Sequence, residues 1–365
     1  MTEREMKIYA IIMAGGVGSR FWPKSRESMP KQFQAVFGEK TLFQRTWQRI
    51  TKLVRPQNVY VITNQIQKGV ALSQIPELSE SNVIAEPFGR NTAPCIATAA
   101  SVISSKSEDS VMIVLPSDHL ISQEDNYIEQ LRNAVQVADK RKSLVTLGIR
   151  PTHPETGFGY IHFEKEVEDI ELRNYGARKV IGFKEKPDPE TAAKFVESGE
   201  YLWNSGMFVW RTDVIVRELE KNLVHFSDFY DQLRMAFGSS DFDRILNEFY
   251  LRVNSISIDY AVMEKASNVL TIPSNFVWSD VGSWDEVYRL SDKDKQGNTF
   301  VGDVISFESS NNFVMGNNRL IALVGINDVV VVETDDALLI CRRGKSQSVK
   351  EIVDLLRKKN RQDLV

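Results

Sequence analysis

A glycine-rich segment with two cationic side chains is the first feature that could do chemistry. Three glycines occur within residues 15–18, directly after the apolar run 7–13. Because glycine has no side chain, backbone amides in such a turn can approach an anion closely. Arg20 adds a planar fork of donors, and Lys31 adds a mobile point charge. Residues 14–33 are therefore predicted to form a phosphate-handling loop.

The spacing of this segment matches neither of two familiar nucleotide-binding patterns. It lacks the GxxxxGK[ST] sequence of a P-loop and the third glycine of GxGxxG. A glycine-rich turn after a strand is, on its own, as consistent with a structural turn as with a phosphate site. Arg20 and Lys31 favour the phosphate interpretation.

An acidic residue, Asp118, follows the apolar run 111–115. It is therefore expected at the C-terminal end of a strand, the edge at which open α/β sheets bind ligands. A carboxylate at this edge can hold Mg²⁺, which prefers oxygen ligands and bridges substrate phosphates. The residues alone leave a second interpretation open, in which Asp118 caps a turn.

Composition and charge exclude several classes of protein. The 365 residues are 42% hydrophobic and 26% charged, as in globular proteins with a sizeable core, and the length predicts two domains. A net charge of −4 provides no broad positive field for nucleic acid or an anionic membrane. The N-terminus lacks a signal-peptide core, and no run of about 18 apolar residues occurs. We therefore expect a soluble, cytoplasmic protein.

Cysteine and histidine usage gives no metal or disulfide signature. The only cysteines are Cys95 and Cys341, which are far apart in the chain and are expected to be buried thiols in a reducing compartment. The four histidines lack the mutual spacing of zinc ligands. The cysteines and histidines are therefore expected to be structural residues.

Short β-rich runs alternate with helical spacing along the first half of the chain. This alternation predicts βαβ units and a Rossmann-like, doubly wound, mostly parallel sheet. The expected strands are 7–13, 58–63, 82–85, 111–115 and 143–149, and the expected helices include 42–53 and 127–138.

Two later segments are expected to shape a cleft on this sheet. The Asn-Thr-Ala-Pro run 91–94 resembles an N-cap with proline in the first turn, so that helix would direct its amides toward a ligand beside Glu86 and Pro87. After Arg150 the regularity loosens, with expected strands at 158–163 and 178–184 and a helix at 189–197. This part is predicted to be an insertion on the same sheet that forms a second wall.

A change in composition near Ser291 predicts a second, smaller domain. Short strands are expected at 300–307, 312–315, 320–324 and 328–333, which is typical of a sandwich fragment or a β-helix. Helical apolar spacing over 346–359 predicts a closing helix. The catalytic domain is thus expected at 1–290 and the β domain at 291–365.

Eight motifs in one order resemble the signature of sugar-nucleotide pyrophosphorylases, in particular the mannose-1-phosphate guanylyltransferases. They are AGGVGSRFWP with PKQF (14–33), EP with RNTAP (86–94), LPSDH (115–119), ETGFGY (155–160), FKEKP (183–187), WNSGMF (203–208), SIDYAVMEK (257–265) and WSDVGSW (278–284). Together they cover the first 285 residues in order, which makes the resemblance much more specific than any single motif.

The resemblance implies a nucleotide-diphospho-sugar transferase fold followed by a small, left-handed β-helix-like domain that supports a homodimer. It also implies that GTP and mannose 1-phosphate react to GDP-mannose and pyrophosphate with Mg²⁺. The implied catalytic residues are Arg20, Lys31 and Lys186, and the implied metal ligands are Asp118 and Asp280. The implied nucleotide-binding residues are Ala14, Gly15, Gly16, Gly18, Ser19, Glu86, Pro87, Asn91, Thr92 and Ala93, and the implied sugar-binding residues are Gly157, Glu185 and Asn204.

Each of these assignments has an alternative when the residue is taken alone. Gly157 could be a turn glycine, Glu185 a surface ion-pair partner, and Asn204 a turn residue. For the whole chain, one alternative is a related transferase for another hexose phosphate or another nucleotide. A second is a non-catalytic nucleotide-sugar sensor, although that class predicts the loss of phosphate and metal residues that are all present here.

Overall fold

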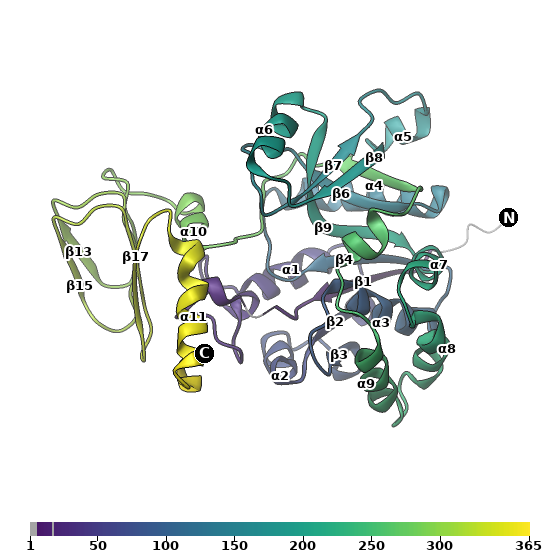
Figure 1. The fold of residues 1–365 in the computed structure, drawn as a ribbon, viewed down its shortest axis with the longest axis horizontal. Helices are drawn as coiled ribbons and strands as arrows, with labels where there is room; N and C mark the ends of the chain where they lie inside the picture. Colours follow the sequence, from purple (N-terminus) through teal and green to yellow (C-terminus); the bar gives the residue numbers. More distant parts are fainter. Residues whose placement is uncertain (1–5, 17) are drawn as a thin grey trace.

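The computed structural model describes residues 6–16 and 18–365, and Figure 1 shows two lobes of unequal size. The larger lobe contains a nine-stranded mixed sheet with strand order β3-β2-β1-β4-β9-β6-β10-β8-β7. The smaller lobe contains short β-strands and ends in helix α11. This arrangement confirms the predicted α/β fold with a small C-terminal β domain. No helix within the described ranges has both the length and the apolar character to cross a membrane.

The first half of the sheet is parallel, as predicted. Strand β1 pairs with β2 on one side and β4 on the other, and β2 pairs with β3. These strands are buried on both faces, which accounts for their nearly continuous apolar sequences. Their C-terminal ends meet at one edge of the sheet, where the glycine-rich loop, Glu86 and Asp118 are found. The strands are β1 (Ile8–Met13), β2 (Val59–Asn64), β3 (Val83–Glu86) and β4 (Val111–Pro116).

The second half of the sheet contains antiparallel strands. The long strand β9 is antiparallel to β4, β6 and β7, and β10 is parallel to β6 but antiparallel to β8. Because β7 pairs with both β8 and β9, the strands β9, β6, β10, β8 and β7 form a closed ring. The segment after Arg150, which was predicted to be an insertion, is part of this same sheet. The strands are β6 (Leu144–Ile149), β7 (Gly159–Phe163), β8 (Arg178–Glu185), β9 (Tyr201–Arg211) and β10 (Val269–Pro273), and a separate pair is formed by β5 (Leu120–Ile121) and β11 (Trp278–Ser279).

Helices cover both faces of the sheet. One buried cluster packs α1, α2 and α4 against one face, and the other packs α3, α7, α8 and α9 against the opposite face. The helices are α1 (Leu42–Ile50), α2 (Gln65–Gln74), α3 (Thr92–Ser104), α4 (Glu124–Arg141), α5 (Ile170–Asn174), α6 (Pro189–Ser198), α7 (Thr212–Asn222), α8 (Phe226–Ala236), α9 (Phe242–Arg252) and α10 (Trp284–Leu290).

Polar N-caps set where several of these helices begin. Thr41 and Gln44 form a capping box at α1, and the Asn64 side chain accepts a hydrogen bond at the start of α2. Asn91 is the N-cap of α3, with Pro94 in its first turn, as the sequence predicts. Each cap satisfies an amide that the helix itself leaves without a partner.

The small lobe is a coil of short strands rather than a sandwich. Strands β12, β14 and β16 stack in parallel, β13 and β15 form a second parallel pair, and β17 adds antiparallel to β16. The expectation of one strand over 300–307 is wrong, because Gly302 turns the chain with φ 92° and divides it into two. The elements are β12 (Thr299–Val301), β13 (Val304–Phe307), β14 (Phe313–Met315), β15 (Ile321–Val324), β16 (Val329–Glu333), β17 (Leu338–Arg342) and α11 (Val349–Lys358).

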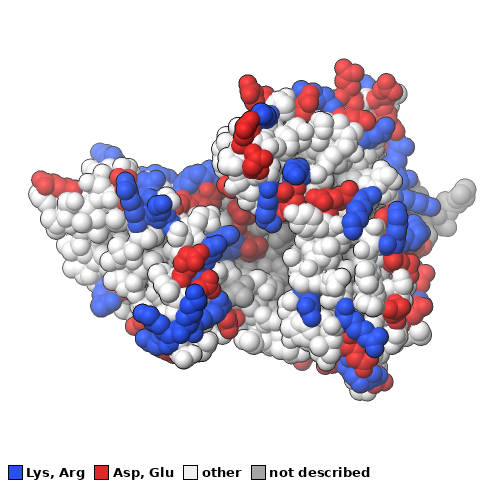
Figure 2. Space-filling view, in the orientation of Figure 1, with Lys and Arg blue, Asp and Glu red and all other residues white. Residues whose placement is uncertain are grey.

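The small lobe packs against Phe21 and Trp22, in the middle of the segment 14–33. The Trp22 indole donates to the carbonyl of Leu364 at 2.9 Å, and the Trp284 indole donates to the carbonyl of Trp22 at 3.2 Å. The Phe21 ring lies 5.0 Å from the Trp284 ring. Figure 2 shows side chains of both charges mixed over most of this face, with Lys and Arg gathered near the C-terminal end of α11. The loop segment is thus fixed by residues from the far end of the chain.

Candidate active site

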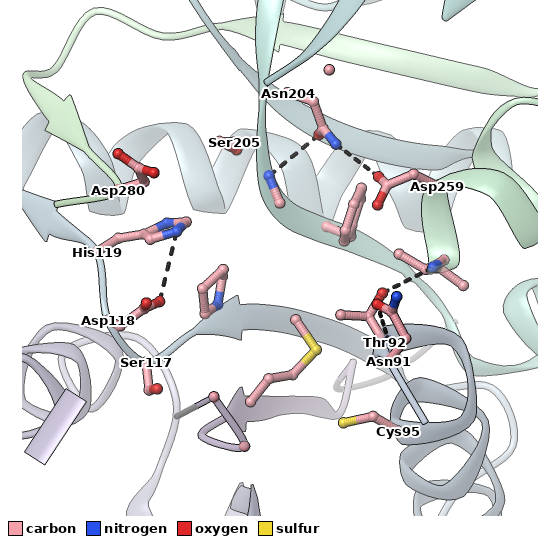
Figure 3. A pocket seen from close by; sticks show the side chains of 18 of the residues that line it. Asn91, Thr92, Cys95, Ser117, Asp118, His119, Asn204, Ser205, Asp259 and Asp280 are labelled. Atoms are coloured by element: carbon pink, nitrogen blue, oxygen red, sulfur yellow. Dashed lines mark hydrogen bonds and ion pairs between the residues drawn. The ribbon is translucent and has the colours of Figure 1, made fainter. Parts of the chain in front are cut away.

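A cavity of about 470 Å³ lies at the C-terminal edge of β1, β3 and β4, with its other wall formed by β8 and β9. Figure 3 shows Asp118 and Asp280 on one side of it and Asn204 and Asp259 on the other. The structure thus brings together residues from most of the motifs singled out in the sequence. The predicted site residues that line the cavity are Gly15, Gly16, Glu86, Asn91, Thr92, Asp118, Gly157, Glu185, Asn204 and Asp280.

The backbone of the glycine-rich loop is held by one buried amide side chain. Gln32 Nε2 donates to the carbonyls of Ala14 and Gly16, at 3.0 Å each. Thr63 Oγ1 donates to the Ala14 carbonyl as well, at 2.9 Å. Among the described residues, no acceptor binds the amides of Gly15 and Gly16. These two amides are therefore available to an anion in the cavity.

Glu86 is a buried carboxyl group at the end of β3. The Tyr250 hydroxyl donates to its Oε1 at 2.6 Å, and burial raises the pKa of Glu86 to about 7, although this hydrogen bond partly offsets the effect. A Cβ atom at Gly15 would lie 3.1 Å from Glu86 Oε2, so the glycine lets the loop pass close to the carboxyl group. Glu86 therefore exchanges a proton near neutral pH.

The N-terminus of α3 forms the next part of the wall. The Asn91 side chain accepts from the Thr92 amide at 2.8 Å, and Asn91 has φ 67° with ψ −170°, a strained conformation that is otherwise almost restricted to glycine. The Thr92 hydroxyl accepts from the Ile258 amide at 2.9 Å, which ties this helix end to the segment carrying Asp259. The Ala93 amide donates to the Ile256 carbonyl at 3.1 Å and Pro94 has no N–H group, so the expectation that this helix directs free amides toward a ligand is wrong, and only its dipole favours a negative charge in the cavity.

Asp118 and Asp280 are linked through Lys31. Lys31 Nζ lies 2.7 Å from Asp118 Oδ2 and donates to the Asp280 carbonyl at 2.6 Å. Desolvation disfavours the ionised form of Asp118, yet the Lys31 ammonium holds its pKa below the usual value. Burial raises the pKa of Asp280 to about 6, and Asp118 adds to that increase while Lys31 opposes it. Two carboxyl groups thus share one ammonium group, which only partly neutralises the negative charge at this corner of the cavity.

The donor set at this corner fits Mg²⁺. Among residues 6–16 and 18–365, no group of three or more His, Cys, Asp or Glu side chains could form a complete metal site. Mg²⁺ is usually held by one or two carboxylates together with waters and substrate phosphates, which is the set that Asp118 and Asp280 offer. The raised pKa of Asp280 also indicates a carboxylate that a nearby cation would stabilise.

His119 is a neutral neighbour of this corner. Burial lowers its pKa to about 4, and its Nδ1 accepts from the Trp278 indole at 3.1 Å. Its Nε2 lies 3.8 Å from Asp118 Oδ1, which is too long for a direct hydrogen bond. His119 therefore packs beside Asp118 without contributing charge.

The opposite wall carries amide and carboxyl groups suited to hydroxyl recognition. Asn204 Nδ2 donates to Asp259 Oδ1 at 2.7 Å, and Asn204 Oδ1 accepts from the Gly206 amide at 3.3 Å. Burial raises the pKa of Asp259 to about 6, and the nearby Glu185 adds to the effect. A Cβ atom at Gly159 would overlap Glu185 Oε2, so any larger residue there would displace this carboxylate.

Eight of the predicted site residues do not line the cavity. Lys31 is buried behind Asp118, and Lys186 pairs with Glu185 Oε1 at 2.9 Å with a side chain that is 61% exposed. Arg20 is exposed on the short helix Ser19–Phe21 and has no ion-pair partner in the described part of the chain. The eight are Ala14, Gly18, Ser19, Arg20, Lys31, Pro87, Ala93 and Lys186.

Sequence reasoning missed several residues that the cavity uses. Asp259 belongs to one of the eight motifs but received no role, and Gln32 received none although it holds the loop. Tyr250, which bonds Glu86 from α9, carries no local signal because its partner is 164 positions away. Asp259 begins a π-helical turn, Asp259–Met263, a feature frequent at functional sites but not encoded by a simple periodicity.

Known proteins with similar sequences belong to one enzyme family. The family model "Nucleotidyl transferase" matches residues 9–297, and "MannoseP isomerase/GMP-like beta-helix domain" matches 302–356. A mannose-1-phosphate guanylyltransferase of Salmonella montevideo is 40% identical over 362 residues, covering 98% of this chain and 75% of the relative. An Escherichia coli protein of the same name, from strain K12, is 40% identical over 367 residues, with the same coverage of both chains.

A solved structure extends the likeness to the whole architecture. A crystal structure from Thermus thermophilus, described as a "mannose-1-phosphate geranyltransferase", has a TM-score of 0.85 and 31% identity, and the match covers 96% of this chain and all of the other. Such a score over both lobes supports the arrangement of sheet and β-helix described above. The chain therefore belongs to the nucleotidyl transferase family and, within it, to the mannose-1-phosphate guanylyltransferases.

Proposed function

We propose that this chain, in the cytoplasm, joins mannose 1-phosphate to GTP, forming GDP-mannose and releasing pyrophosphate. The observation that carries the proposal is one cavity that combines two loop amides with no acceptor among the described residues, a helix N-terminus, a carboxylate pair and a wall of hydroxyl-binding groups. A nucleotide phosphate and a sugar phosphate need these features side by side.

The guanine base is proposed to bind beside Glu86 and the start of α3. Guanine presents two neighbouring donors, the N1–H and N2–H groups, whereas adenine lacks this pair on the same edge. An ionised Glu86 accepts from both, and the Tyr250 hydroxyl holds the carboxylate through Oε1. Asn91, Thr92 and Ala93, with Pro87 next to Glu86, complete the proposed base site.

The triphosphate is proposed to lie along the glycine-rich loop. The amides of Gly15 and Gly16, with Gly18 and Ser19 beyond them, would surround it, and Arg20 would close over it from the exposed side. Lys31 contributes positive charge beside Asp118. An oxygen of mannose 1-phosphate attacks the α-phosphorus, the bond to the bridging α–β oxygen breaks, and pyrophosphate leaves with that electron pair.

Asp118 and Asp280 are the residues that would hold Mg²⁺. When bound, the ion offsets the negative charge of the phosphates at the reacting centre. The protein residues align the two polyanions, because positioning and electrostatics supply most of the catalysis in such transfers. Lys186 is proposed to bind the phosphate of the sugar, and Glu185, Asn204 and the backbone at Gly157 its hydroxyls.

Release of pyrophosphate across a matrix of nucleoside triphosphates and hexose 1-phosphates tests the substrate assignment. The expected result is the highest kcat/KM for GTP with mannose 1-phosphate, and no release without a divalent cation. A clear preference for UTP or dTTP would favour a related transferase instead. Binding of GDP-mannose without any turnover would favour a nucleotide-sugar sensor.

A homodimer is proposed to form through the small lobe. The strands β13, β15 and β17 expose large apolar side chains, and an interface with a second copy would remove them from water. Light scattering after size exclusion is expected to give twice the mass of the 41.6 kDa chain. Phe307→Asp with Ile340→Asp is expected to give monomers. The exposed residues are Ile305, Phe307, Val324, Leu338 and Ile340.

A further inference from the structure

A second cavity, of about 440 Å³, opens at one end of the ring of strands β9, β6, β10, β8 and β7. Around this ring β6 and β10 are parallel, and every other neighbouring pair is antiparallel. The C-terminal ends of β6, β7 and β10 therefore meet the N-terminal ends of β8 and β9. Residues close to these strand ends line the cavity, which we name the ring mouth: Arg150, Phe163, Lys165, Arg178, Gly199 and Pro273.

Three cationic side chains line the ring mouth, and none of its lining residues is acidic. Lys165 Nζ lies 3.2 Å from Glu200 Oε1, so its charge is compensated from outside the cavity. Among the residues that the structure describes, Arg178 donates only to the Ala177 carbonyl, and Arg150 has no hydrogen-bond or ion-pair partner. The two guanidinium groups therefore give the ring mouth an excess of positive charge.

The ring mouth has the chemistry of a phosphate site. A guanidinium group is a planar fork of donors that binds phosphate oxygens in pairs. A phosphate ester carries about two negative charges at neutral pH, which matches the two uncompensated arginines. Pockets that hold small molecules begin at about 300 Å³, so the cavity has room for more than a phosphate group. A phosphorylated metabolite therefore fits the ring mouth better than free phosphate does.

The ring mouth also offers groups for the carbon skeleton of such a compound. Phe163 packs against Ile161 and Leu202 of the same ring and gives the cavity an apolar wall. Thr271 is paired with Arg178 across β10 and β8, and directly paired residues have their side chains on the same face of a sheet. Thr271 Oγ1 is buried without a hydrogen-bond partner in the described part of the chain, which is rare for a polar group.

We propose that the ring mouth is a second anion site, which binds a small phosphorylated metabolite with its phosphate between Arg150 and Arg178 and its carbon skeleton against Phe163. The site lies at the opposite end of β7 and β8 from Gly159 and Glu185, which line the active-site cavity. The eight residues of β8 span roughly 25 Å between the two. The proposal therefore does not depend on the proposed function.

Hydrogen exchange of the unaltered protein locates the bound anion. Glucose 6-phosphate is the probe, at about 10 mM, which nearly saturates a site with a Kd of about 1 mM. Amides at 163–165, 176–178 and 199–201 are expected to exchange up to about tenfold slower, because the ligand holds the strand ends together. No protection there, or protection confined to the glycine-rich segment, would overturn the proposal.

Inorganic phosphate is the second probe in the same experiment. It is expected to protect the same amides more weakly, because it makes no contact with Phe163. Equal protection by the two probes would show that the carbon skeleton adds nothing, and would overturn the assignment to a phosphate ester.

Isothermal titration with glucose 6-phosphate tests the two arginines. Arg150→Gln with Arg178→Gln is expected to weaken binding about tenfold or more, because the charge-assisted hydrogen bonds are lost. Arg132→Gln with Lys179→Gln is the matched control, since it removes two positive charges from residues that do not line the ring mouth. An equal loss of affinity in both double variants would show an effect of net charge alone and refute the site.

A second pair of substitutions keeps the test decisive if the glutamine variant folds poorly. Arg150→Lys with Arg178→Lys retains both charges but loses the planar forks, so binding about threefold weaker than in the wild type is expected. Wild-type affinity in this variant would contradict recognition of the phosphate by the guanidinium groups.

Discussion

Replacing Tyr250 by Phe isolates the hydrogen bond that keeps Glu86 ionised. The hydroxyl donates to Glu86 Oε1 at 2.6 Å, and this bond partly offsets the burial that raises the Glu86 pKa to about 7. A hydrogen bond to a charged group contributes about 1.5–3 kcal/mol, and one pKa unit corresponds to about 1.4 kcal/mol. Tyr250→Phe is therefore expected to raise the Glu86 pKa by about one to two units.

The proposed guanine site turns this shift into a change of affinity. If only ionised Glu86 accepts the guanine donors, wild-type affinity for GTP rises as pH increases through about 7 and then levels off. At pH 7, the ionised fraction falls from about one half to between about a tenth and a hundredth in Tyr250→Phe, which weakens GTP binding by about five- to fiftyfold. The affinity should recover near pH 9.

Isothermal titration from pH 5.5 to 9.5 measures both profiles. Tyr230→Phe is the matched control, because Tyr230 lies on α8 and does not contact Glu86. If the Tyr250→Phe profile coincides with that of the wild type, Glu86 does not bind the base as an anion. An equal loss of affinity at every pH would mean that the variant damages packing rather than ionisation.

Protein stability gives an independent check on the same carboxyl group. A raised pKa means that the folded state binds the Glu86 proton more tightly than the unfolded state does. This contribution to stability is complete below about pH 4.5 and is lost as pH rises through about 7. Glu86→Gln, which cannot ionise, is expected to be more stable than the wild type at pH 8 by up to about 3 kcal/mol and to show no gain at pH 4.5.

Three further changes probe the two walls and the contact between the lobes. Asp280→Asn is expected to reduce kcat by about a hundredfold or more. The melting temperature should not fall, because the buried carboxylate of Asp280 is already costly to ionise. If turnover is unchanged over a range of Mg²⁺ concentrations, Asp280 is not a metal ligand. Gly159→Ala should displace Glu185 and raise KM for the sugar phosphate with KM for GTP unchanged, and steady-state kinetics would contradict this if both constants stayed the same. Trp22→Phe loses the bond to the Leu364 carbonyl and should cost about 1 kcal/mol in chemical denaturation, whereas a transition identical to the wild type would show that this bond adds nothing to the docking of the lobes.

Much of the fold followed from local patterns. The strands that end before the glycine-rich loop, at Glu86 and two residues before Asp118 were expected within a residue or two of their observed bounds, because buried parallel strands have continuous apolar sequences. The N-cap at Asn91 was expected for the same kind of reason, since capping depends on a few adjacent residues. By contrast, the strand expected at 300–307 is broken at Gly302, where a corner of the coil depends on the stacked neighbours.

The candidate site shows the same division between local and distant information. Residue types and motif order determined which positions supply phosphate-binding amides, carboxylates and hydroxyl-binding groups, because each motif is a short stretch whose chemistry is visible in sequence. Tertiary structure alone decided which side chains contact one another: Tyr250 contacts Glu86, Asp259 contacts Asn204, and Lys31 contacts both Asp118 and the backbone of Asp280. Burial and charge act through space, so the pKa values of Glu86 and Asp280, and the inward direction of a lysine expected to bind phosphate, follow only from the packed fold.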